Sequence, residues 1–293
     1  LPASGAAGTP GSVTVTALDA FGNVATSYSG TVHFTSSDGL ATLPADMTLT
    51  NGVGTFSETF ESTGNQTITA TDTVSPGING TSNTEAVKGG AATHLVVSIP
   101  GNGAAGTPGT VTVTALDAFG NVATGYTGTV HFTSTDSHAV LPANMTLTNG
   151  VATFSETLDT AGSQTITATD TVSSAITGTS GVETITAGAA THFAVTLPAS
   201  GTAGTPGSTT VTALDAFGNV ATGYAGTVHF TSSDGHAVLP SDMTLSNGVG
   251  TFSETLDTAG NQTITATDTV SAGVTGTSNA ETVAPGAATH FVV

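Results

Sequence analysis

The residues of this sequence best suited to bind a ligand are acids and an amide that lie near predicted turns. Asp19, Asn23, Asp38, Asp72 and Glu85 carry oxygen atoms of the kind that bind calcium. Calcium takes about six to eight oxygen ligands, so these residues form a site only if their loops meet at one end of a domain. No Asp-x-Asp-x-Asp-Gly loop occurs, and an isolated Asp in a turn usually binds its own backbone. Calcium is the one candidate cofactor, and a purely structural turn is the alternative for Asp19 and Asn23.

One acid occupies an unusual position in its predicted strand. Phe56, Glu58 and Phe60 alternate with polar residues, which places a carboxylate on an apolar face, and Glu156 and Glu254 repeat this arrangement. A strand bulge or a contact between domains explains such a placement without catalysis. Neither a Gly-x-Ser-x-Gly nor a His-Glu-x-x-His motif occurs. We therefore predict that the chain has no catalytic residues and is not an enzyme.

Charge and composition exclude several classes of partner. The 293 residues include 20 acids and a single base, Lys88, for a net charge of −19. Binding to phosphates depends on Lys and Arg, so nucleic acid is not a predicted partner. No apolar run approaches the roughly 20 residues that span a bilayer, and we expect no membrane insertion in this segment. Because the sequence has no Cys, disulfides and thiol chemistry are absent.

A repeat organises the whole sequence. The ten residues Ala17–Thr26 return at Ala115–Thr124 and again at Ala213–Thr222, at intervals of 98 residues. Three copies of a unit of single-domain size indicate a tandem array.

Each unit has the pattern of β-strands. Apolar and polar residues alternate in Val13–Leu18, Thr31–Thr35 and Gln66–Thr71, which is typical of half-buried antiparallel strands. Asn51-Gly52 separates two further strands and predicts a hairpin turn. About seven short strands per unit favour an all-β fold of three tandem immunoglobulin-like antiparallel β-sandwiches.

The domain boundaries follow from the first strand of each unit. Ala92–Ser98 comes after the Gly89-Gly90 spacer and predicts the first strand of the second unit. Three domains are predicted, formed by residues 1–88, 89–186 and 187–284. The first of these domains lacks a first strand. Residues 285–293 carry a further first strand, formed by Ala288, Thr289, His290, Phe291, Val292 and Val293.

Two interpretations of this last strand stay open, because an unpaired strand edge invites pairing with another chain. In the first, residues 288–293 complete residues 1–88 of a neighbouring copy, head to tail, and such contacts build a fibre since they do not close. In the second, the sequence is a section of a longer chain, and either more repeats follow or the ends are arbitrary. The predicted partners are accordingly other copies of the chain or further repeats of the same chain.

The string Ala17–Thr26, together with Gly30–Ser36 and Asn65–Asp72, resembles bacterial immunoglobulin-like repeats. Such repeats occur in large secreted and cell-surface proteins, including invasin- and intimin-like adhesins, and the resemblance covers the whole chain three times. It implies an extracellular, cell-surface location and a structural role in a fibre, filament or stalk. The alternative function is that of an adhesin segment that binds a surface, a glycan or calcium through its loops.

Overall fold

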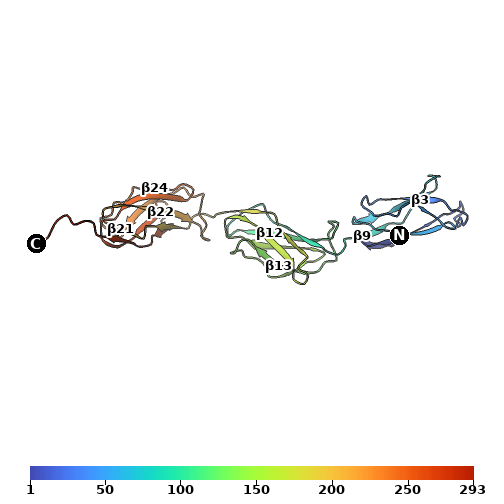
Figure 1. Cartoon of the computed structure of the whole chain (residues 1–293), viewed down its shortest axis with the longest axis horizontal. Coiled ribbons are helices and arrows are strands. Elements are labelled where there is room, and N and C mark those ends of the chain that lie inside the picture. Colours follow the sequence, from blue (N-terminus) through green and yellow to red (C-terminus); the bar gives the residue numbers. More distant parts are fainter.

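The computed structural model describes residues 1–293 and contains strands, turns and loops but no helix. Three β-sandwiches follow one another in a row, as Figure 1 shows. None of its elements is a helix long and apolar enough to cross a membrane. The predicted all-β fold with three tandem units is confirmed.

The strands fall into three groups. The first sandwich contains β1 (Ser4–Ala6), β2 (Gly11–Thr16), β3 (Thr31–Ser36), β4 (Met47–Thr48), β5 (Val53–Glu58), β6 (Gly64–Gln66), β7 (Ile68–Asp72), β8 (Asn79–Thr81) and β9 (Glu85–Lys88). The second contains β10 (His94–Ser98), β11 (Asn102–Ala104), β12 (Pro108–Leu116), β13 (Thr129–Ser134), β14 (Met145–Thr146), β15 (Val151–Thr157), β16 (Gly162–Gln164), β17 (Ile166–Asp170), β18 (Thr177–Thr179) and β19 (Glu183–Thr186). The third contains β20 (His192–Thr196), β21 (Ser200–Thr202), β22 (Pro206–Leu214), β23 (Thr227–Ser232), β24 (Met243–Thr244), β25 (Val249–Thr255), β26 (Gly260–Gln262), β27 (Ile264–Asp268), β28 (Thr275–Thr277) and β29 (Glu281–Ala284).

The second and third sandwiches share one topology. In the second, β10-β12-β15 forms one sheet and β14-β13-β17-β18 forms the other. A smaller sheet, β11-β19-β16, contains the only parallel pairing of the sandwich, between β11 and β19. The third sandwich repeats these three sheets with β20-β22-β25, β24-β23-β27-β28 and β21-β29-β26.

The core lies between the sheets because the strands alternate. Val111 and Val113 of β12 pack with Phe132 of β13 and Phe154 of β15, and all four are buried. The intervening threonines face outward, where pairs such as Thr167 and Thr179 form hydrogen bonds across neighbouring strands. This arrangement buries one face of each sheet and leaves the other in water.

The predicted hairpin turn is present in every unit. Asn51 and Gly52 have φ angles of 51° and 76°, and Asn149-Gly150 and Asn247-Gly248 adopt the same positive values. Two successive residues with positive φ match a tight hairpin turn, and Asn-Gly is the sequence that tolerates it best.

The first sandwich differs from the others at one edge. Its strand β2 pairs with β5 alone, whereas β12 and β22 each pair on both sides. No strand occupies the place that β10 and β20 have in their sandwiches. At the other end of the row, residues 285–293 form no strand and extend away from the third sandwich (Figure 1).

Candidate interface and ligand sites

The five candidate calcium ligands are distributed over different hydrogen-bond networks. Asp19 and Asn23 lie in an exposed turn, where Asp19 Oδ1 accepts hydrogen bonds from the backbone N–H groups of Phe21 and Asn23, at 2.9 and 2.8 Å. The side-chain amide of Asn23 also donates to both carboxylate oxygens. The hydrogen bonds from the Asn23 side chain, followed by those from the backbone N–H groups, lower the pKa of Asp19.

Asp38 is buried and ties two loops together. Its Oδ1 accepts a hydrogen bond from Leu40 N, and its Oδ2 accepts from Glu61 N at 2.8 Å and Ser62 N at 2.9 Å. Burial opposes ionisation of Asp38, but these N–H donors outweigh it and lower its pKa.

Asp72 closes the turn that follows β7. It accepts hydrogen bonds from the Tyr28 hydroxyl and from the backbone N–H groups of Val74 and Ser75. The bond from Tyr28 is the main reason that its pKa is lowered, and burial together with Asp72 raises the pKa of Tyr28 to about 12. The carboxylate thus orders its own loop.

Glu85 faces a second acid that sequence reasoning did not connect with it. Glu58 of β5 and Glu85 of β9 are both buried, and both oxygens of Glu58 lack a hydrogen-bond partner. Burial, and then the charge of Glu58, raises the pKa of Glu85. Each carboxylate lies over a glycine: a Cβ added to Gly11 would overlap with Glu58, and one added to Gly5 would overlap with Glu85. The apolar position of Glu58 was visible in the strand alternation, but its neighbour was not.

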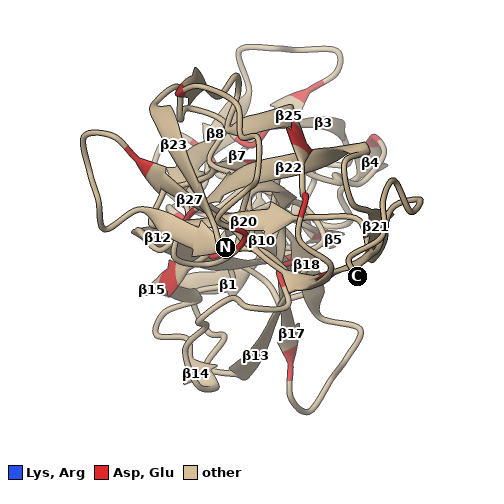
Figure 2. Cartoon of the chain, turned by 90° about the vertical axis from the view of Figure 1, so that its left-hand side faces the viewer, with Lys and Arg blue, Asp and Glu red and all other residues tan.

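The five residues are therefore not brought together. No group of three or more His, Cys, Asp or Glu side chains gathers anywhere in the chain. Figure 2, which looks along the row of sandwiches, shows the acids at separate positions around its axis.

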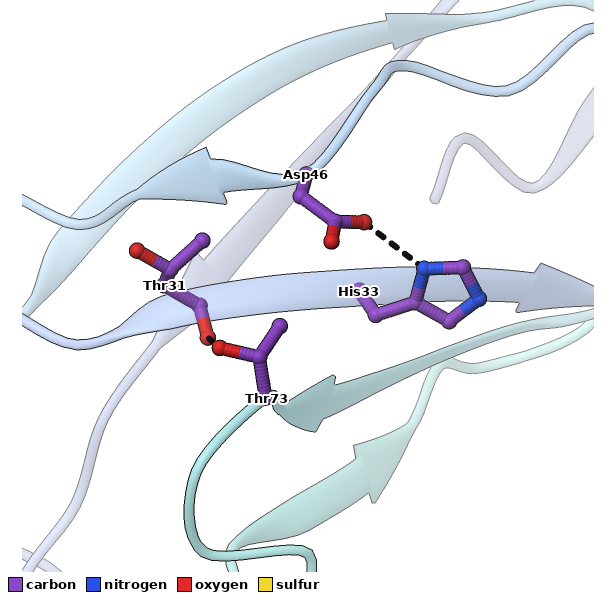
Figure 3. Close-up of polar contacts among 4 residues, drawn as sticks. All are labelled: Thr31, His33, Asp46 and Thr73. Atoms are coloured by element: carbon purple, nitrogen blue, oxygen red, sulfur yellow. Dashed lines mark hydrogen bonds and ion pairs between the residues drawn. The ribbon is translucent and has the colours of Figure 1, made fainter.

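His33 pairs with an acid at the surface. Its Nδ1 lies 2.7 Å from Asp46 Oδ1, and both side chains are largely exposed. Figure 3 shows this pair beside Thr31 and Thr73. The hydroxyl of Thr73 donates a hydrogen bond to the carbonyl oxygen of Thr31 at 3.2 Å. In the second sandwich the equivalent His131 contacts Asn144 instead, at 2.9 Å. The position therefore accepts a neutral partner, which fits a solvated strand histidine.

The first sandwich contains a groove that the other two sandwiches lack in open form. It has a volume of about 520 Å³ and runs along β2, with β8 on its other side and Tyr28, Val32, Leu49, Ile68 and Ala70 in its floor. We call it the β2 groove. In the second sandwich, β10 covers the corresponding residues, so that Val113 and Ala115, the counterparts of Val15 and Ala17, are fully buried there.

The strands that cover these positions in the other sandwiches do so with two apolar side chains. Leu95 and Val97 of β10 are buried in the second sandwich, and Phe193 and Val195 of β20 are buried in the third. The Phe193 ring stands edge-on to Tyr224, with ring centroids 5.5 Å apart.

A glycine makes room for the covering strand. A Cβ on Gly178 of β18 would overlap with the carbonyl oxygen of Leu95, and Gly276 of β28 has the same relation to Phe193. The first sandwich keeps this glycine as Gly80 of β8, yet nothing lies within 4 Å of its missing Cβ. The β2 groove thus has the shape of a strand site.

The predicted inter-subunit strand has the same pattern as β10 and β20. Residues 288–293 make no backbone pairing, and Phe291 and Val292 are 94% and 92% exposed. One repeat earlier, Phe291 and Val293 correspond to Phe193 and Val195, the two side chains of β20 that are buried.

Comparisons with known proteins identify solved structures of bacterial proteins. No protein-family model matches the chain, and neither does any curated protein. The adhesin FdeC of Escherichia coli is 20% identical, with 97% of this chain and 95% of that chain covered and a TM-score of 0.48. InvD of Yersinia pseudotuberculosis is 19% identical, with 94% and 93% covered and a TM-score of 0.39. Invasin, a bacterial integrin-binding protein, is 17% identical, with 94% and 60% covered and a TM-score of 0.38.

These similarities concern the fold alone.

Proposed function

We propose that the chain is a structural unit of an extracellular fibre or stalk at a bacterial cell surface, joined head to tail by strand donation. Residues 288–293 of one copy fill the β2 groove of the next copy. The observation that carries this proposal is the groove itself, whose lining is the one that β10 and β20 cover in the other two sandwiches.

The side chains of the donated strand fit the positions available. Phe291 takes the place of Phe193 and comes beside Tyr28, as Phe193 stands beside Tyr224. Val293 takes the place of Val195. Burying one Phe and one Val contributes about 3–5 kcal/mol, to which the backbone hydrogen bonds of a new ladder with β2 are added.

The location rests on the tandem architecture and its resemblance to cell-surface repeats. Outward-facing threonines keep such an array in solution, and a row of sandwiches extends away from its point of attachment. The alternative function, an adhesin segment that binds a surface, a glycan or calcium through its loops, predicts a ligand that binds the monomer and leaves the β2 groove open.

Sedimentation of the purified chain over a range of concentrations tests the proposal. We expect oligomers that grow with concentration and that disappear when residues 288–293 are deleted. Phe291→Asp should abolish assembly because it places a charge in the groove. Val292→Asp is the matched control, since its counterpart Val96 is 44% exposed and points outward. A chain that stays monomeric, or one that assembles equally well without residues 288–293, would contradict strand donation.

A further inference from the structure

The two joints within the chain are built by the same loop. In the first joint, Asn121 Nδ2 donates to the carbonyl of Glu61 at 2.7 Å, and Thr63 N donates to Asn121 Oδ1 at 3.3 Å. Asp117 Oδ2 accepts from Gly90 N, in the linker, at 2.8 Å. The loop Asp117–Asn121 of the second sandwich thus binds both the preceding sandwich and the linker.

The second joint repeats these bonds one unit later. Asn219 Nδ2 donates to the carbonyl of Asp159 at 2.7 Å, and Ala161 N donates to Asn219 Oδ1 at 2.9 Å. Asp215 Oδ2 accepts from Gly188 N at 2.8 Å. Two independent copies of one set of contacts define a specific interface rather than a chance contact.

An aromatic ring completes each joint. Phe119 lies against Gly8 of the preceding sandwich and Phe217 lies against Gly106, so closely that a Cβ on either glycine would overlap with the ring. The contact leaves Phe119 and Phe217 only 41% and 47% exposed.

The first sandwich carries the same loop without a partner. Asp19–Asn23 has the same sequence and the same internal hydrogen bonds. However, Asp19 Oδ2 accepts only from Asn23, Asn23 Oδ1 accepts no hydrogen bond, and Phe21 is 91% exposed.

The complementary surface is open at the opposite end of the row. Gly204 corresponds to Gly8 and Gly106, and no aromatic ring lies near it. The Asp257 carbonyl and the Ala259 N–H correspond to the groups that bind Asn219, and both residues are exposed without a backbone partner. Gly286 corresponds to Gly90 and Gly188, and its N–H is also unpaired.

We propose that the Asp19–Asn23 loop is a docking surface for the C-terminal pole of a second copy of this chain, formed by Gly204, Asp257, Ala259 and Gly286. Phe21 covers Gly204, Asn23 binds the backbone of Asp257 and Ala259, and Asp19 accepts from Gly286 N. This inference rests on the proposed head-to-tail assembly and adds a second contact to it.

The two contacts are compatible because Gly286 and the donated strand are joined. In the first joint, Gly90 N donates a hydrogen bond to Asp117 of the second sandwich. Strand β10, which begins at His94, belongs to that same second sandwich. Gly286 stands at the same distance in sequence before His290. A strand that enters the β2 groove therefore brings Gly286 to Asp19, and the loop fixes the direction in which the donor sandwich leaves.

The critical concentration for assembly, measured by sedimentation, tests the docking surface. We expect Phe21→Ala to raise it roughly tenfold or more, because about half of a Phe surface loses its burial. Phe217→Ala is the matched control: it removes the same ring from a joint inside the chain and should leave the critical concentration unchanged. The thermal stability of the monomer should not change in Phe21→Ala, since the ring is exposed there.

The outcomes separate docking from strand donation. If deletion of residues 288–293 abolishes assembly while Phe21→Ala and Asn23→Ala assemble as the unaltered chain does, docking is overturned and strand donation stands. If the unaltered chain does not assemble at any concentration, both proposals are overturned. A rise in critical concentration for Phe21→Ala and Asn23→Ala, but not for Phe217→Ala, supports docking.

Discussion

At the scale of the residue, each sandwich keeps two glutamates in its core without a base to pair with them. In the second sandwich these are Glu156 and Glu183, and Glu156 lies over Gly109, where a Cβ would overlap with its carboxylate. Burial, and then the charge of Glu183, raises the pKa of Glu156 from 4.5 to about 7. The same acid that interrupts the apolar strand pattern therefore makes the domain sensitive to pH.

The sign of this sensitivity follows from the direction of the shift. The folded state holds the proton of Glu156 more tightly than the unfolded state does, so stability is highest below pH 4.5 and falls as the pH rises to about 7. Such a shift corresponds to at most about 3 kcal/mol. We predict that Glu156→Gln stabilises the second sandwich by about 2 kcal/mol at pH 8 and has little effect at pH 4, because the amide carries no charge.

Calorimetric unfolding between pH 4 and pH 8 provides the measurement. Asp46→Asn is the control for a general loss of negative charge, because the second sandwich already has Asn144 at the equivalent surface position. An unaltered chain whose melting temperature does not depend on pH in this range would refute the prediction.

At the scale of the element, sequence patterns located the strands and the hairpin turns. Alternation of apolar residues predicted β2, β3 and β7, and Asn51-Gly52 predicted its turn, because both signals are local. The role of Gly80 was not predictable, since a glycine within a strand has several explanations. Only the close approach of the Leu95 carbonyl to Gly178 shows that this position accommodates a neighbouring strand.

The same substitution is predicted to act differently in two sandwiches. Gly178→Ala should destabilise the second sandwich by about 1–3 kcal/mol, because the added methyl group meets the backbone of β10. Gly80→Ala should leave the stability of the free chain unchanged, since nothing lies near its Cβ, but it should weaken assembly at least tenfold by obstructing the donated strand. Thermal unfolding and sedimentation measure the two effects, and equal assembly by Gly80→Ala and the unaltered chain would contradict the fit of a strand in the β2 groove.

At the scale of the whole molecule, one loop sequence has two environments. The string Asp-Ala-Phe-Gly-Asn was predicted as a turn, and each copy is one, with Gly22, Gly120 and Gly218 at positive φ. Its second role, in joining sandwiches, depends on groups 58 to 60 residues away in sequence, such as Thr63 and Glu61 for Asn121. Such contacts do not produce an alternation of apolar and polar residues along the sequence. The sequence could therefore predict the sandwiches but not the contacts that hold one sandwich to the next.

The joints should determine how straight the row of sandwiches is. Replacing both Asn121 and Asn219 by Ala removes two hydrogen bonds from each joint, which contribute about 1 kcal/mol apiece. We predict a shorter maximum dimension and a broader distribution of shapes in small-angle X-ray scattering of the chain without residues 288–293, which keeps it monomeric. Asn23→Ala is the matched control, because it loses the same bonds within the loop but belongs to no joint in the monomer. If the double variant scatters as the control does, the hydrogen bonds of the joints contribute nothing to the straightness of the row. The packing of Phe119 and Phe217 and the short linkers must then hold the row straight.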